Sequence, residues 1–261
     1  MRQNGRLRVR AVPVPELTPA TVDAMWRLYR DHYDHVDRTS FDRDLSEKTL
    51  AFLGTDEGSA EVVGFSTALF YRHRHGGRSV GIYFSGDTIV HPRYWGQTAL
   101  HRCVIGTLLR WKLRHPFMTL YWYLICSGYR TYLSLVRNFP EHWPHHERAM
   151  PAWELGLIDS LSRSRYGDAW KARRGVISFG EAQPRLKTLV APLTSAVLAL
   201  PEVRCFVAAN PAYARGDELA MIARVDVPAV VGMFAKWLRR ALAHRPGSRT
   251  VTGAGLSRPA V

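Results

Sequence analysis

The chain has 261 residues, of which 46% are hydrophobic and 22% charged, and its formal net charge is +14 at pH 7. This composition is typical of a globular protein and excludes a fibrous or disordered one. No apolar run reaches the ~18 residues of a membrane-spanning helix. The first residues lack the apolar segment of a secretory signal, so we expect a cytoplasmic protein.

The excess of positive charge indicates an anionic partner. Nucleic acid, a membrane surface, a phosphorylated cofactor and an acidic protein all fit it. The chain has three cysteines, Cys103, Cys126 and Cys205, each in an apolar run and too widely spaced for a metal or redox motif. We expect buried free thiols, with Cys126 as a nucleophile as the alternative.

The first half of the sequence predicts two helices followed by antiparallel strands. A strand over residues 7–14 precedes a helix that starts after Thr18, an N-cap residue followed by Pro19. A second short helix is expected from Ser40. Strands joined by short turns are then expected over residues 49–55, 61–72 and 79–90.

The second half begins with a helix over residues 99–115 and a strand over residues 117–126. A right-handed crossover makes this strand parallel to the one before the helix. The further elements expected are a helix at 127–139, a polar loop at 141–151, a helix at 152–167, strands at 174–179, 203–209 and 218–225, and an amphipathic helix at 228–243. One domain over residues 1–245 is expected, extended from about residue 141, with a disordered tail at 246–261.

The stretch GDTIVHPRYWGQTALH, residues 86–101, places a bend between a strand and a helix. A helix N-terminus carries unsatisfied backbone N–H groups and a partial positive charge, which suit a phosphate. Gly96 would let the backbone approach such a group, and Arg93 would add a fixed charge. A plain strand-to-helix turn is the alternative.

The order of these elements and the stretch Arg93-x-x-Gly96-x-Thr98-Ala99 resemble the GNAT superfamily of N-acyltransferases, over roughly Val9 to Pro140. The resemblance implies an α/β fold with a mixed, mostly antiparallel central sheet flanked by helices. The second glycine of the family's pyrophosphate loop is replaced here by Thr98. Ser134 stands where many members carry a tyrosine, with Tyr132 and Tyr129 nearby.

The resemblance implies an enzyme that transfers an acyl group from a thioester to an amine by direct attack. The donor would be acyl-CoA, acetyl-CoA or an acyl-phosphopantetheine on an acidic carrier protein, and the acceptor a small molecule or a peptide. A backbone N–H of Ile89 or Val90 would stabilise the oxyanion, and the same strand would pair with the pantetheine arm. The residues expected to bind the donor are Ile89, Val90, Arg93, Trp95, Gly96, Gln97, Thr98 and Ala99.

Asp87 is the acidic residue nearest this point and is the candidate general base; a turn carboxylate that binds backbone N–H groups is the alternative. Tyr83 is a further catalytic candidate; it and Ser85 share the face of Asp87 if no bulge intervenes. Tyr132 is the candidate acid for the departing thiolate, with a core position as its alternative. His91 is a further candidate base.

Two histidine groups are candidate metal sites. His73 and His75 would share one face of a strand, and His145 and His146 are adjacent, but two ligands are weak evidence. We therefore expect no metal. The alternative to an enzyme is a non-catalytic basic module of the same fold that binds nucleic acid or an anionic membrane surface; for the enzyme, no nucleic acid is expected, and peripheral membrane contact stays open.

Overall fold

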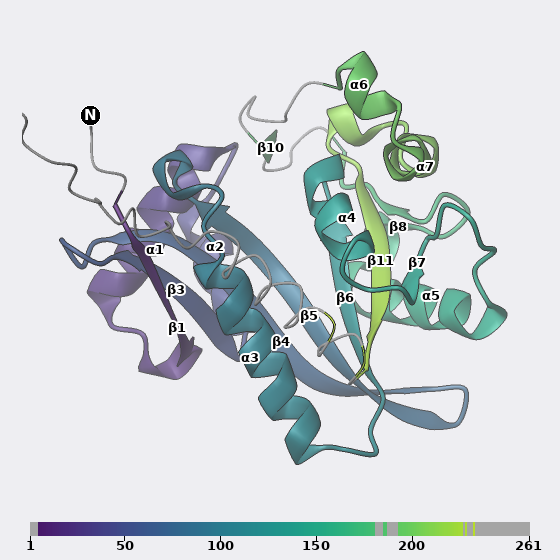
Figure 1. Cartoon of the computed structure of the whole chain (residues 1–261), viewed down its shortest axis with the longest axis horizontal. Coiled ribbons are helices and arrows are strands. Elements are labelled where there is room, and N and C mark those ends of the chain that lie inside the picture. The colour runs from purple at the N-terminus through teal and green to yellow at the C-terminus, as the bar shows by residue number, and fades with distance from the viewer. Residues whose placement is uncertain (1–4, 181–184, 187–192, 227, 229–231, 233–261) are drawn as a thin grey trace, which may run out of the picture.

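The computed structural model describes residues 5–180, 185–186, 193–226, 228 and 232 (Figure 1). The predicted helix at 228–243 lies outside these residues except for two positions, and the predicted tail at 246–261 lies outside them entirely. Among the described residues, no helix is long and apolar enough to cross a membrane.

The strands are β1 (Leu7–Pro13), β2 (Tyr33–Asp34), β3 (Leu50–Asp56), β4 (Val62–His75), β5 (Arg78–Val90), β6 (Leu120–Cys126), β7 (His142–Trp143), β8 (Trp170–Lys171), β9 (Val176–Ile177), β10 (Arg185–Leu186) and β11 (Glu218–Val225). The α-helices are α1 (Pro19–His32), α2 (Arg38–Ser46), α3 (Ala99–Arg114), α4 (Tyr129–Val136), α5 (Ala152–Tyr166), α6 (Ser195–Leu198) and α7 (Pro201–Ala209).

Within the described chain the main sheet has nine strands. Eight follow the order β1-β3-β4-β5-β6-β11-β9-β8, and β7 pairs with β11. The pair β5–β6 is parallel, as the crossover through α3 requires, and the other pairs in this part of the chain are antiparallel. The predicted mixed, mostly antiparallel sheet is therefore confirmed.

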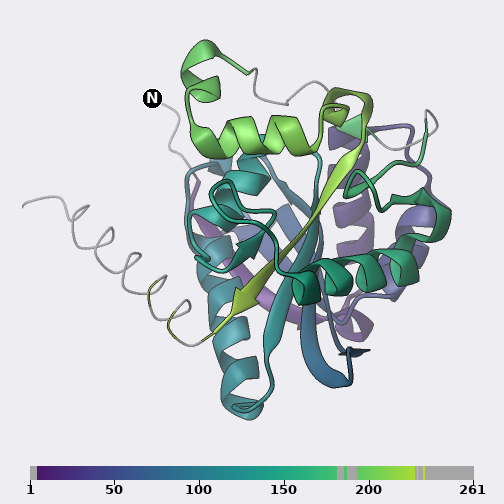
Figure 2. The ribbon, with the colours of Figure 1, turned by 90° about the vertical axis from the view of Figure 1, so that its right-hand side faces the viewer.

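Helices cover both faces of the sheet. On one face α3, α4 and α7 bury side chains such as Leu108, Tyr132 and Phe206 against β5, β6 and β11. On the other face lie α1, α2 and α5, whose buried side chains include Met25 and Leu157. Figure 1 shows α3 in front of the sheet and α1 behind it, and Figure 2 shows β11 running between α5 and α7.

Strands β5 and β6 pair over only a short length and then separate. The parallel register joins residues 81–84 of β5 to residues 120–123 of β6, although β5 continues to Val90 and β6 to Cys126. The ladder between β4 and β5 is also interrupted where β5 inserts one extra residue, because Ser66 pairs with Thr88 and Ala68 with Ser85. Gly86 and Asp87 therefore both stand opposite Thr67, which is a β-bulge.

Three local predictions differ from the structure. The predicted strand at 203–209 is wrong, because these residues form α7, which begins at Pro201 and buries Val203 and Phe206 on one face. Helix α2 starts earlier than expected, since the Asp37 carboxylate accepts from the Ser40 N–H at 2.7 Å and caps it. The loop at 141–151 is not wholly solvated, because His142 and Trp143 are buried as strand β7.

Candidate active-site cleft between strands β5 and β6

A cleft of about 420 Å³ lies where β5 and β6 separate. Its walls come from β5 over Phe84–Thr88, from the end of β6 and the start of α4, and from the first residue of β11. The end of α1, α2 with the following Lys48, the end of α5 and Phe179 complete the lining. The lining side chains with polar or charged groups include Tyr29, Tyr33, Asp44, Lys48, Asp87, Ser127, Tyr129, Arg130, Arg165, Tyr166 and Glu218.

Asp87 reaches this cleft because of the bulge. In an uninterrupted strand it would share the face of Tyr83 and Ser85, which looks toward α3; the extra residue turns it to the face covered by α1 and α2. Burial raises the pKa of Asp87, and the neighbouring carboxylates of Asp44 and Glu218 raise it further. The positive charge of Lys48 opposes this rise, and the resulting pKa is about 7. A carboxyl group with this pKa can take up a proton at neutral pH.

Glu218 faces Asp87 across the cleft from the opposite strand wall. It is the first residue of β11, and the register places it beside the end of β6 because Leu219 pairs with Cys126. The Ser127 hydroxyl donates a hydrogen bond to its carboxylate. Burial raises the pKa of Glu218, while that hydrogen bond opposes the rise.

Two buried or half-buried cations balance these carboxylates. The Lys48 side chain is fully buried, and its Nζ lies 2.5 Å from Asp44 Oδ1 and 3.0 Å from the Asp44 carbonyl oxygen. The Arg165 guanidinium lies 3.5 Å from Asp44 and stacks over the Phe84 ring at 4.1 Å. Asp44, Lys48 and Arg165 thus form a charge-paired network on the α2 side of the cleft.

Tyrosine side chains form the α1 wall. The rings of Tyr29 and Tyr33 stack at 4.8 Å between centroids. Burial, followed by the charge of Asp87, raises the pKa of both hydroxyls well above the usual value. These hydroxyls remain neutral near Asp87, so they can donate hydrogen bonds to a bound group.

The bend lies beside the cleft rather than in it. The Trp95 Nε1–H donates to the Val90 carbonyl oxygen at 2.6 Å, and the Arg130 guanidinium lies 6.0 Å from the Trp95 ring centroid. Because Arg130 belongs to α4 and lines the cleft, Trp95 and Arg130 connect the two sides of the gap between β5 and β6.

The rest of the bend shows a mixed fit to a phosphate site. Gly96 has φ of +83°, with open space where a side chain would lie, and the first turn of α3 receives no side-chain cap from Thr98. Arg93 is exposed, and Ala99 is buried. The Gln97 side chain is occupied by the start of β1, since it accepts from Leu7 N–H at 2.8 Å and donates to the Gly5 carbonyl at 2.9 Å.

The strand register also distinguishes the two predicted oxyanion donors, the backbone N–H groups of Ile89 and Val90, because they point to opposite sides of β5. His91 N–H donates to the Val63 carbonyl in β4, and the alternation of an antiparallel ladder directs the Ile89 N–H toward β4 as well. The N–H and C=O of Val90, like those of Thr88, face the gap, as the Trp95 hydrogen bond to Val90 requires. Ile89 itself is buried under α1 and α2.

The predicted tyrosines Tyr83 and Tyr132 do not line the cleft. Tyr83 is 1% exposed and packs between Phe70 and Trp122 on the α3 side. Tyr132 is fully buried with its ring 5.6 Å from that of Phe206 in α7. Of the two tyrosines in α4 it is Tyr129 that borders the cleft.

The alternative sites are placed elsewhere. The Cys126 thiol is buried against Met221, and burial raises its pKa, so it is a core residue and not an activated nucleophile. His91 is exposed and its ring accepts from the Arg93 N–H at 3.3 Å. His73 binds Ser160 in α5 at 2.8 Å, and His75 packs on Trp153, so their rings contact α5 rather than a common ligand position.

Sequence reasoning missed Glu218, Lys48 and Arg165. Each lies far from Asp87 in the chain, and the pairing of β11 with β6 that delivers Glu218 has no local signal. A weak signal existed for the tyrosine wall, because Tyr29 and Tyr33 lie on one predicted helical face with Trp26.

Neither the family models nor the curated proteins give a match. Three solved structures illustrate the similarities found. A probable N-acyltransferase from Enterococcus faecalis V583 is 14% identical with a TM-score of 0.39, over 49% of this chain and 31% of that one. The GNAT-family N-acetyltransferase YhbS from Escherichia coli, in complex with CoA, is 19% identical with a TM-score of 0.37, over 59% and 81%.

Arabidopsis thaliana NAA60 in complex with acetyl-CoA is 13% identical with a TM-score of 0.36, over 49% of this chain and 85% of that one. This chain thus aligns with about a third of the Enterococcus protein. The matches include members of the class that the sequence resemblance predicted. At this level of similarity, the assignment of a function depends on the residues of the cleft.

Proposed function

We propose that this protein is an N-acyltransferase that moves an acyl group from a thioester to an amine in the cleft between β5 and β6. The observation that carries the proposal is the placement of Asp87, a carboxyl group with a pKa near 7, at a bulge where two parallel strands separate. The gap exposes β5 backbone that pairs with no other strand of the described chain and could pair with an extended pantetheine arm, and Asp87 offers a base beside it.

The reaction follows from these groups. The neutral amine attacks the thioester carbonyl carbon, and the Asp87 carboxylate takes the proton that the amine loses as the C–N bond forms. The N–H of Thr88 or Val90 donates to the oxyanion. The C–S bond then breaks, and the Tyr129 hydroxyl protonates the leaving thiolate; Asp87 returns its proton to solvent, and Tyr129 regains one. The products are an amide and a free thiol.

The acceptor is an amine, small or peptide-borne, that enters from the side of α1 and α2. The Asp87 carboxylate lines the cleft and attracts an ammonium group, which gives up one proton to solvent before the neutral amine attacks. Tyr29 and Tyr33 supply flat, neutral walls that suit the carbon skeleton of the acceptor.

The donor is acyl-CoA, acetyl-CoA or an acyl-phosphopantetheine on a carrier protein. The open first turn of α3 and the positive φ of Gly96 support a phosphate seat. A second cavity of about 430 Å³ between β1 and α3 is lined by Arg6, Arg8, Arg102 and Arg110. This concentration of positive charge supports an acidic carrier protein as the donor's source.

The test is release of free thiol and formation of amide from acetyl-CoA, a long-chain acyl-CoA and an acylated carrier protein, each with a panel of amines. We expect turnover with at least one donor and its loss in Asp87→Asn, with Asp31→Asn, an exposed carboxylate on α1, as the matched control. Turnover that is equal in Asp87→Asn and wild type removes Asp87 from the mechanism. No turnover with any donor, together with salt-sensitive binding to nucleic acid or anionic vesicles, supports the non-catalytic module instead.

A further inference from the structure

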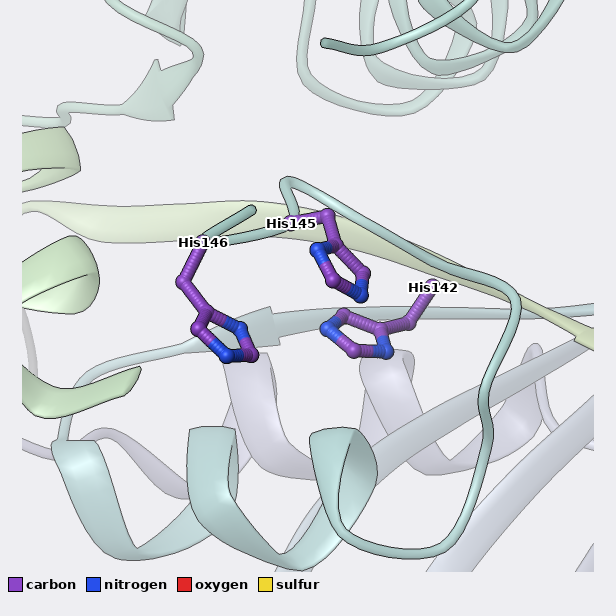
Figure 3. A group of neighbouring side chains, drawn as sticks. All are labelled: His142, His145 and His146. Atoms are coloured by element: carbon purple, nitrogen blue, oxygen red, sulfur yellow. The ribbon is translucent and has the colours of Figure 1, made fainter. Parts of the chain in front are cut away.

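Three histidines meet in the segment that links α4 to α5. His142 lies on β7, which pairs with β11, and His145 and His146 follow in the next turn. One ring nitrogen of each lies within 4.8 Å of the other two. Figure 3 shows the rings of His142 and His146 pointing toward one another with His145 above His142. None of the three is among the residues that line the cleft.

The hydrogen bond of His142 fixes which of its nitrogens can bind a metal. Its Nδ1 lies 2.7 Å from the carbonyl oxygen of Phe139. A carbonyl oxygen only accepts, so Nδ1 carries the proton and Nε2 keeps a free lone pair. His142 is 2% exposed, and its Nε2 is buried with no hydrogen-bond partner among the described residues. A buried acceptor in this state is costly unless a ligand satisfies it.

His146 has the same arrangement from the opposite side. Its Nδ1 is also buried and has no hydrogen-bond partner in the described part of the chain. Its Nε2 lies 3.7 Å from the carboxylate of Glu147. In protein metal sites a ligating histidine commonly donates its other N–H to a carbonyl or a carboxylate. His142 with Phe139 follows this pattern; the 3.7 Å between His146 and the Glu147 carboxylate has to shorten before a hydrogen bond forms.

We propose that His142, His145 and His146 form a binding site for a divalent transition metal ion of the Zn²⁺ class. Three imidazoles suit Zn²⁺, Cu²⁺ or Ni²⁺ rather than Mg²⁺ or Ca²⁺, which require oxygen ligands. In a tetrahedral zinc site the ligand nitrogens are about 3.4 Å apart. The nitrogens, which lie within 4.8 Å of one another, thus need to close by up to about 1.4 Å, which side-chain rotation supplies.

His145 must give up a hydrogen bond before it can bind the metal ion. Its ring stacks on His142 at 4.4 Å and on His146 at 4.8 Å, and its Nδ1 accepts from the Glu147 N–H at 3.0 Å. Ligation by Nδ1 releases that N–H to solvent, since Glu147 is exposed. Arg148 is the nearby opposing charge, and Glu141 pairs with it at 2.9 Å, which reduces its repulsion of a bound cation.

The site would serve structure rather than acyl transfer. It lies outside the cleft. A bound ion would tie the turn with His145 and His146 to His142 on β7, which pairs with β11. Both α4 and α5 contribute cleft residues, among them Tyr129 and Arg165. A metal at this point would stabilise the segment that sets the distance between these two helices.

The test is direct binding of Zn²⁺ to the full chain after treatment with a chelator, by titration calorimetry and by metal content after dialysis. We expect one ion per chain, a Tm that rises by roughly 5 to 10 °C at a hundredfold excess over Kd, and visible d–d absorption when Co²⁺ replaces Zn²⁺. His146→Gln and His142→Gln should each weaken binding at least tenfold, whereas His32→Gln on α1 should not.

His146→Gln is the decisive variant, because the His146 side chain is partly exposed whereas that of His142 is buried. Its Tm without metal, compared with that of the wild type, verifies the fold. Equal Zn²⁺ affinity in His146→Gln and wild type overturns the proposal, as does a wild-type chain that loses all metal on dialysis. Because thiol release is not measured, the outcome is independent of the acyltransferase assignment.

Discussion

The indole Nε1 of Trp95 donates a hydrogen bond of 2.6 Å to the carbonyl oxygen of Val90. That carbonyl faces the gap between β5 and β6, where a pantetheine arm would pair with β5. The Trp95 indole thus already binds the Val90 carbonyl oxygen, to which an extended ligand would donate a hydrogen bond. A donor thioester that binds along β5 has to displace this indole.

Trp95→Phe should therefore tighten the binding of acyl-CoA. The substitution keeps an aromatic ring but removes the N–H that competes for the Val90 carbonyl. One hydrogen bond of ~1 kcal/mol corresponds to roughly fivefold in Kd, measurable by titration calorimetry. Trp26→Phe on α1 is the control, and an affinity that is the same in Trp95→Phe and wild type would show that the donor does not reach Val90.

The rate should depend on pH through Asp87. Catalysis needs the carboxylate, so kcat/KM should rise with pH and reach half of its maximum near pH 7. Asp87→Asn should remove this rise of kcat/KM with pH and lower kcat/KM by roughly 10²- to 10⁴-fold. A rise of kcat/KM with pH that comes from deprotonation of the amine acceptor persists in Asp87→Asn. An unaltered pH profile in this variant would assign the whole rise to the acceptor.

Lys48 should influence the pH at which kcat/KM reaches half of its maximum. Its charge lowers the pKa of Asp87 against the effect of burial. Lys48→Met should therefore raise the pKa of Asp87 and move this midpoint to higher pH, as seen in profiles of kcat/KM. Lys171→Met, an exposed lysine on β8, should leave the midpoint in place; a shift toward lower pH in Lys48→Met would contradict this assignment.

Asp87 should also reduce the stability of the protein at alkaline pH. Its pKa is raised on folding from 3.8 to about 7, so between these values the native state holds a proton that the unfolded state has lost. Stability contributed by this proton is complete below pH 4 and is lost as pH rises through 7. Asp87→Asn should be more stable than wild type at pH 8, by up to about 4 kcal/mol, with little difference near pH 4.

Urea unfolding at the two pH values measures this effect. Asp31→Asn, whose carboxylate is exposed, should show no comparable gain at pH 8. If Asp87→Asn were destabilised equally at both pH values, the carboxylate would be a structural acceptor and not a strained base.

Gly86 should not tolerate a side chain. A Cβ at this position would lie 2.3 Å from Thr67 Oγ1 and 2.9 Å from Lys48 Cε. Gly86→Ala should lower the free energy of unfolding by about 1–3 kcal/mol, and adding Thr67→Ala should recover part of the loss. Gly106→Ala in α3 is the matched control: no atom lies within 4 Å of its Cβ, so it should stabilise the helix by about 1 kcal/mol. A neutral Gly86→Ala would mean that the bulge relaxes freely.

Much of the fold could be predicted because its signals are local. Thr18 and Pro19 mark the start of α1, and the handedness of crossovers gives the parallel pairing of β5 with β6. The residues of α7 resemble a strand in sequence because Val203, Cys205 and Val207 alternate; Pro201, a common first helical residue, is the stronger signal.

The site was only partly predictable for a physical reason. Asp87 was identified from its nearness to the bend, but its orientation depends on a bulge that the sequence does not reveal. Its pKa depends on Asp44, Lys48 and Glu218, which tertiary contacts bring together. The sequence places His142 three residues before His145, but its burial, which leaves Nε2 without a partner among the described residues, depends on the pairing of β7 with β11.

The position of β11 has a consequence for the order in which the protein is made. β11 lies between β6 on one side and β7 and β9 on the other, yet among the described strands it is the last to leave the ribosome. Until Val225 has emerged, β6 presents an open hydrogen-bonding edge and the core beneath α4 has no cover, a state prone to association with other chains. Glu218 arrives with the same strand, so a nascent chain acquires its cleft and its protected edge in the same step of synthesis.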